Sequence, residues 1–187
     1  MKVESTVSNI AQYYINRAYL DSRDNRGECI TLTKLQRLLY FSQGCYGVIN
    51  NNDKLFDADF VHGRNGPIVL EIEAKYSNWG QRGINLREES VDISNNIQYF
   101  LQNIYLLYGQ YSTWRLTEMV FNELPWSTTK QDETITFESM TKYFKIYHDD
   151  RLNTIKIRDK KILESAMSLR DRGILDDDFI IKNFYKY

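Results

Sequence analysis

The sequence predicts a mainly α fold: a single compact multi-helix domain with at most a short β-hairpin or extended segment near residues 54–65. Apolar residues recur at helical spacing along most of the chain. Ser or Thr stands before several of these segments, and Gly or Pro stands after them. The chain has 187 residues, of which 42% are apolar, so its length and composition suit one domain with a real core. We therefore expect residues 1–187 to form one domain, with 148–187 as a helical C-terminal extension packed on it.

Two helices are expected in the first fifty residues. The first ends in the polar segment before Gly27, and its apolar stripe comprises Val7, Ile10, Ala11, Tyr14 and Ala18. The second begins near Thr33, which has the spacing of a capping box with Gln36. Its stripe comprises Leu35, Leu38, Leu39, Ser42 and Cys45, and its small residues would let another element approach closely.

The stretch "FVHGRNGPIV" after the second helix predicts a sharp turn. Gly66 gives the backbone the freedom that a tight turn needs, and Pro67 suits the first turn of a helix because its missing N–H costs nothing there. The third helix is therefore expected to start at Pro67 and to end at Gly80.

The later helices have clear start signals. Ser94 is expected to cap a helix that ends at Gly109, Ser112 a shorter helix closed by Pro125, and Thr136 the segment "FESMTKYFKIY". Two more helices are expected in the C-terminal extension, one from Asp159 to Gly173 and a last short one in "DDDFIIKNFY".

Charge and composition argue against several classes of protein. The net charge is −1, and the two cysteines, Cys29 and Cys45, are isolated from each other and from histidine. We expect neither a disulfide framework nor a metal site, and no cofactor. The N-terminus lacks a signal-peptide pattern, and no run of ~20 apolar residues is present. These features favour a cytoplasmic protein with no membrane segment.

The sequence carries no familiar catalytic motif, so we expect a protein that is not an enzyme. His148 is expected to be structural. His62 lies in the glycine turn, and an enzyme using it with Asp57 or Asp59 is an alternative with little support in the sequence. The two aspartates could also share a face and bind a cation, although a solvated turn is the simpler interpretation.

Nucleic acid is also disfavoured as a partner. The late segment from Arg151 to Arg172 is locally basic, but acidic residues interleave with the basic ones. This pattern is typical of a solvated helix face rather than a phosphate-binding surface. A DNA-binding regulator therefore stays a minor alternative.

Three segments in order, "TLTKLQRLLYFSQG", "KLFDADFVHGRNGPIV" and "LTEMVFNELPWSTT", resemble the Panacea domain, also called the SocA-like antitoxin or phage-associated protein family. The resemblance covers about residues 7–147. The family pattern has Lys where this chain has Arg37, and Ala-Trp where it has Val61 and His62. The family histidine of the last motif is absent near Val120 and Phe121.

The resemblance implies a protein that neutralises a toxin or another protein partner by direct contact, in some members as an adaptor that presents the toxin to a protease. An alternative is a phage counter-defence protein that inhibits a host nuclease, as anti-CRISPR proteins do. The segments that carry the resemblance suggest one partly exposed, aromatic and charged partner-binding surface. Its candidate residues are Arg37, Tyr40, Phe41, His62, Gly66, Pro67, Glu123, Pro125 and Trp126.

Overall fold

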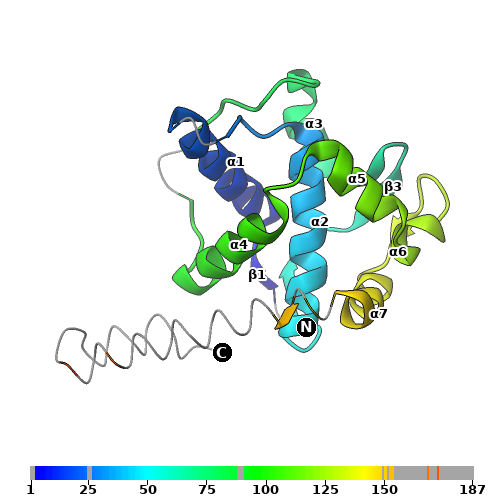
Figure 1. Cartoon of the computed structure of the whole chain (residues 1–187). Helices are drawn as coiled ribbons and strands as arrows, with labels where there is room; N and C mark the ends of the chain where they lie inside the picture. Colours follow the sequence, from blue (N-terminus) through cyan, green and yellow to red (C-terminus); the bar gives the residue numbers. More distant parts are fainter. Residues whose placement is uncertain are drawn as a thin grey trace.

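A computed structural model describes residues 3–24, 27–87 and 91–148, together with Asp150, Leu152, Asn153, Ser168 and Arg172. These residues are mainly helical (Figure 1). The helices are α1 (Val7–Arg23), α2 (Leu32–Ile49), α3 (Leu70–Tyr76), α4 (Asn95–Tyr108), α5 (Thr113–Phe121), α6 (Leu124–Ser127) and α7 (Phe137–Tyr147), with a 3-10 helix η1 (Ser77–Trp79) after α3. The strands are β1 (Val3–Ser5), β2 (Lys54–Phe56), β3 (Phe60–Gly63), β4 (Gly66–Ile68) and β5 (Thr134–Ile135).

Helix α2 lies at the centre of the described structure. Every residue from Leu35 to Gly47 is buried, so the helix is covered on all sides rather than along one stripe. Helices α1 and α4 pack on one side of it, and α5 and α7 pack on the other (Figure 1). The close approach expected at the small residues is confirmed, because a side chain at Gly44 or Gly47 would meet Phe144 or Phe137 of α7.

The strands form two small sheets. Strand β1, which the sequence did not predict, pairs in parallel with β2. Strand β3 pairs antiparallel with β4 on one side and with β5 on the other, in the order β4-β3-β5. The β3–β4 hairpin reverses at Arg64 and Asn65, so the predicted extended segment is real but continues to Ile68, beyond the expected limit at residue 65.

Several predicted helix ends are confirmed. The side chains of Ser94, Ser112 and Thr136 each accept a hydrogen bond from a backbone N–H in the first turn, as an N-cap does. Gly109 follows the end of α4. Gly80 follows η1 with a positive φ of 54°.

Three predictions about helix boundaries are wrong. The cap of α2 is Thr31, not Thr33, because Gln36 points inward and bonds to the backbone of Val69. Pro67 lies in β4, and α3 begins only at Leu70. Strand pairing with β3 thus overrides the local preference of Pro67. Helix α5 ends at Phe121, and Pro125 belongs to the separate short helix α6.

The expected helices from Asp159 to Gly173 and in "DDDFIIKNFY" lie outside the described residues. The same is true of most of the late basic segment. Of the extension, Leu152 is described and fully buried, and its backbone N–H bonds to His148 O.

Candidate functional site

Arg37 lies beneath the tip of the β3–β4 hairpin. Its guanidinium donates hydrogen bonds to the backbone oxygens of Asn65 and Pro67, the latter at 2.8 Å, and Nε donates to Thr117 Oγ1 at 3.4 Å. The side chain is 1% exposed. Burial lowers the pKa of Arg37 to about 10, against the opposing charges of Tyr40 and Glu73, so the group is a cation at neutral pH. Arg37 therefore fixes the hairpin from inside the fold.

Gly66 meets the same guanidinium from the hairpin side. Its φ is +118°, a conformation that side chains disfavour. A Cβ at this position would also collide with the Nη2 and Cζ atoms of Arg37. The expectation that Gly66 holds a special backbone conformation is confirmed, although the element that follows it is a strand.

A chain of buried polar groups joins α2, α4, the α5–α6 junction and the end of α7. Tyr40 donates its hydroxyl hydrogen to Glu123 Oε2 at 2.9 Å. Glu123 Oε1 lies 3.0 Å from His148 Nε2, and His148 Nδ1 lies 3.0 Å from the Tyr108 hydroxyl. All four side chains are buried. Burial and the neighbouring Glu123 carboxyl raise the pKa of Tyr40 well above its usual value. The structural role expected for His148 agrees with this placement.

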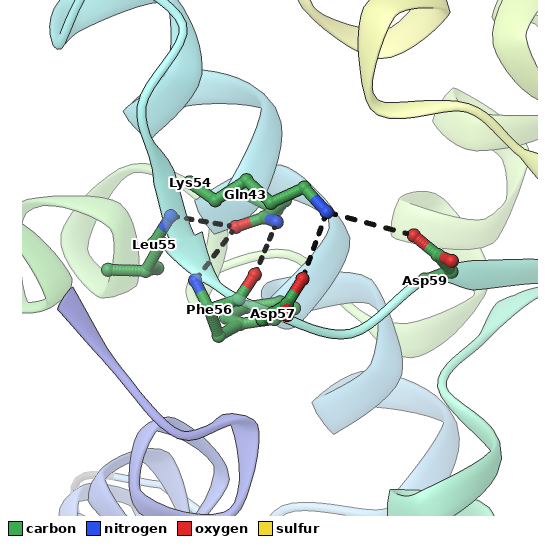
Figure 2. A network of polar contacts seen from close by, with 6 residues as sticks. All are labelled: Gln43, Lys54, Leu55, Phe56, Asp57 and Asp59. Atoms are coloured by element: carbon green, nitrogen blue, oxygen red, sulfur yellow. Dashed lines mark hydrogen bonds and ion pairs between the residues drawn. The ribbon is translucent and has the colours of Figure 1, made fainter. Parts of the chain in front are cut away.

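The side chain of Gln43 forms hydrogen bonds with the backbone of β2, as Figure 2 shows. Its Oε1 accepts from the backbone N–H groups of Leu55 and Phe56, and its Nε2 donates to Phe56 O. Beside it, Asp57 and Asp59 point toward Lys54, at 3.1 and 4.0 Å from its Nζ. The two aspartates do share one partner, but that partner is a lysine, and both are exposed.

Three rings stack where the hairpin meets α5 and α6. The Trp126 ring lies 4.3 Å from the His62 ring and 4.2 Å from the Phe121 ring, measured between centroids, and it is nearly parallel to both. His62 Nδ1 and Trp126 Nε1 are buried atoms with no hydrogen-bond partner among the residues that the structure describes. His62 is thus a packing partner of Trp126, and the enzyme alternative with Asp57 or Asp59 gains nothing from this placement.

The outer side of the stack is exposed. Phe121 is 37% exposed and Leu124 is 54% exposed. Trp114, which is 71% exposed, lies seven residues before Phe121 and therefore on the same side of α5. We call these five side chains, Trp114, Phe121, Leu124, Trp126 and His62, the aromatic face. Figure 1 shows α5, α6 and β3 together on one side of α2.

The structure shows where the candidate residues of the predicted partner surface lie, and their binding of a partner stays a prediction. The structure brings its segments together, since Arg37 holds Asn65 and Pro67 while Trp126 stacks on His62. The expected exposure is wrong for most of the members, because α2 is covered on every side. The buried candidates are Arg37, Tyr40, Phe41, Gly66, Pro67, Glu123 and Pro125.

The exposed members of this face are not among the residues predicted from the sequence. Phe121 was singled out only as a departure from the family pattern, and Leu124 and Trp114 were not singled out. A sequence pattern could have indicated this exposed side of α5. Trp114 and Phe121 are seven residues apart on a short helix, and the residues of that helix that face the core are Leu116 and Val120.

A second concave region lies between α1, α4 and the loops before α2 and α5. This cleft of about 610 Å³ is lined by residues that include Arg17, Asp21, Lys34 and Tyr105. Lys34 Nζ donates to Gly109 O at 2.6 Å, and Arg17 pairs with Asp21 at 3.4 Å. Positive and negative groups therefore balance inside it, and its charges are used within the protein.

Comparison with known proteins gives no match: no family model, no curated protein and no solved structure matches the chain. The resemblance to the Panacea domain accordingly stays a prediction. Within the described ranges, no helix is long and apolar enough to cross a membrane. The same residues contain no group of three or more His, Cys, Asp or Glu side chains placed to hold a metal ion.

Proposed function

We propose that this protein neutralises a protein partner by direct binding, in the manner of an antitoxin, and that the aromatic face is the contact surface. The observation that carries the proposal is the three-ring stack of His62, Trp126 and Phe121. The helices that supply Phe121 and Trp126, α5 and α6, also carry the exposed side chains Trp114 and Leu124. Interfaces concentrate affinity in a few such aromatic anchors.

The surroundings of the face favour a preformed surface over a flexible one. Trp126 follows Glu123 by three residues, and Glu123 is bonded to Tyr40 and His148 inside the core. His62 is held in β3, between β4 and β5. Side chains that are fixed before binding lose less conformational entropy when a partner docks.

The charged groups near the face suit a polar rim. Arg115 and Glu118 form an exposed ion pair on α5, between Trp114 and Phe121 in the sequence. An apolar centre with charged groups around it is the common anatomy of a protein interface.

The resemblance to the Panacea domain supports the same class of function. Members of that family look like cytoplasmic antitoxins, some of which hand a toxin to a protease. A nuclease inhibitor of a phage would use the same kind of surface, so the identity of the partner decides between the two.

The test begins with the genes next to this one in its native genome, one of which the proposal expects to encode a small protein that arrests growth when it is expressed alone. We expect co-expression to relieve the growth arrest that this neighbour causes alone. The variant Leu124→Asp, which places a charge in the aromatic face, should lose the relief. Leu106→Asp, the same change at a similarly exposed leucine on α4, should keep it.

Two results would contradict the proposal. One is equal relief by Leu124→Asp and the parent protein. The other is that the protein binds a host nuclease instead of the neighbour-encoded protein. In that case Leu124→Asp should abolish binding to the nuclease, and Leu106→Asp should not. The second result would establish the nuclease-inhibitor alternative.

A further inference from the structure

A small recess lies beside the hairpin tip, apart from the aromatic face. It has a volume of about 230 Å³ and opens between the hairpin, α2 and α3. Its polar lining comprises Thr33, Gln36, Arg37, Arg64, Asn65 and Glu73. The recess therefore places one buried and one exposed arginine at the same opening.

Arg37 reaches this recess with hydrogen-bonding capacity to spare. A guanidinium carries five N–H donors, and Arg37 uses three of them, all on uncharged oxygens. No carboxylate of the described residues lies within 4.0 Å of it. A buried cation is costly unless an anion or enough hydrogen bonds compensate it. Its surroundings thus leave room for an anionic partner.

The charges of the residues that line the recess determine which charge a bound anion should carry. The lining includes two arginines, Arg37 and Arg64, and one acidic residue, Glu73, so it carries one excess positive charge. Glu73 accepts a hydrogen bond from Gln36 Nε2 at 3.4 Å and acts on Arg37 only through its field. One bound monoanion would balance the recess, whereas a dianion would add repulsion from Glu73.

We propose that this recess binds a carboxylate, held between the guanidiniums of Arg64 and Arg37. Planar carboxylates match the fork of a guanidinium, and a monoanion matches the charge of the lining. In the complex, the carboxylate belongs to an acidic residue of the protein partner; this last statement rests on the proposed function. Binding of a free carboxylate does not depend on it.

The test follows backbone amide NMR signals of the hairpin tip, including Gly63 and Asn65, in the protein alone. The probe is N-acetylglycine, and the matched control is N-acetylglycinamide, which differs only in lacking the carboxylate. We expect saturable shifts with a dissociation constant on the order of millimolar for the acid and none for the amide. Inorganic phosphate should bind more weakly than the acid.

Three variants sharpen the test. Arg64→Gln should weaken binding by about fivefold, the usual scale of one exposed charge pair. Glu73→Gln should strengthen binding by about the same factor, because it removes the repelling charge while keeping an acceptor for Gln36. A damaged fold cannot produce such a gain. Arg23→Gln, an exposed arginine of α1 outside the recess, should change nothing.

The inference is overturned by equal shifts with the acid and the amide, by tighter binding of phosphate, or by a Glu73→Gln variant that binds no better than the parent. None of these results touches the aromatic face. Conversely, failure of Leu124→Asp to affect the partner leaves N-acetylglycine binding intact, so the two proposals fail separately.

Discussion

At the scale of single residues, side-chain amides and a guanidinium replace missing backbone partners. Gln43 bonds to β2, Gln36 bonds to Val69, and Arg37 bonds to the hairpin carbonyls. Gln36 and Gln43 are seven residues apart on α2 and so lie on the same side of the helix. A buried helix with such polar residues can organise short extended segments that lack enough strand neighbours.

Gly66 offers the most direct test of the hairpin. Gly66→Ala should lower the free energy of unfolding by about 2–4 kcal/mol, because it combines backbone strain with a collision against Arg37. Gly80→Ala is the matched control, since its φ is also positive but nothing lies within 4 Å of the added Cβ. Chemical denaturation measures both. Equal losses for the two variants would show that the contact with Arg37 adds nothing.

Gln43 can be tested in the same way. Gln43→Ala removes the hydrogen bonds that its side chain makes to two buried N–H groups and one carbonyl of β2, so we expect a loss of about 2–4 kcal/mol. Gln110→Ala, at an exposed glutamine just after α4 that bonds to carbonyls of the last turn of that helix, should cost less than about 0.5 kcal/mol. A Gln43→Ala loss as small as that of Gln110→Ala would contradict the role shown in Figure 2.

At the scale of elements, helix starts were predictable where the signal is local. Ser94, Ser112 and Thr136 cap helices through bonds within four residues, so a single sequence contains the whole cause. The helix predicted to start at Pro67 is wrong because Pro67 lies in a strand that pairs with β3. Strand β3 in turn pairs with β5, which lies some seventy residues later in the sequence. The burial of Arg37 likewise depends on α5 and the hairpin, which both pack on α2. These contacts join distant parts of the sequence, so no local sequence pattern predicts them.

The buried polar chain ties these elements to one another. His148→Leu would leave the Glu123 carboxyl with Tyr40 alone, and we expect it to lower stability by about 3 kcal/mol. The double variant Glu123→Leu/His148→Leu should cost less than the sum of the two single variants, because both singles break the same contact. Additive losses would show that the two side chains act independently.

At the scale of the whole molecule, burial of tyrosines makes stability sensitive to alkaline pH. Burial raises the pKa of Tyr14 and Tyr40 well above 10.0, and it raises the pKa of Tyr13 and Tyr105 to about 12. In the unfolded chain these groups lose their protons near pH 10. Their contribution to stability is therefore complete below about pH 10 and lost as the pH rises further.

We expect the free energy of unfolding to fall above about pH 10, with phenolate absorbance and loss of helical circular dichroism appearing together. The lowered pKa of Arg37 acts in the opposite direction, but one group does not offset four. Ionisation of all tyrosines near pH 10 with an unchanged circular dichroism spectrum would contradict the burial of these rings.

The mainly α character of the chain could be predicted from its sequence, and so could the neighbourhood of the candidate site. The exposed side of that site could not. Tyr40 and Phe41 look like surface anchors when α2 is given a single buried stripe, whereas the structure surrounds α2 completely. Of the exposed anchors, Trp114 lies outside the motifs that carry the family resemblance, whereas Leu124 lies inside the last of them, between Glu123 and Pro125.

The central claim is that the aromatic face binds a protein partner, and calorimetric titration of the purified neighbour-encoded protein tests it most directly. Leu124→Asp should weaken the dissociation constant by at least about thirtyfold, which corresponds to roughly 2 kcal/mol at an interface hot spot. Leu106→Asp should leave it within about twofold of the parent value, as expected for a residue outside the contact. If both variants bind the neighbour as tightly as the parent protein does, the aromatic face is not the partner-binding surface.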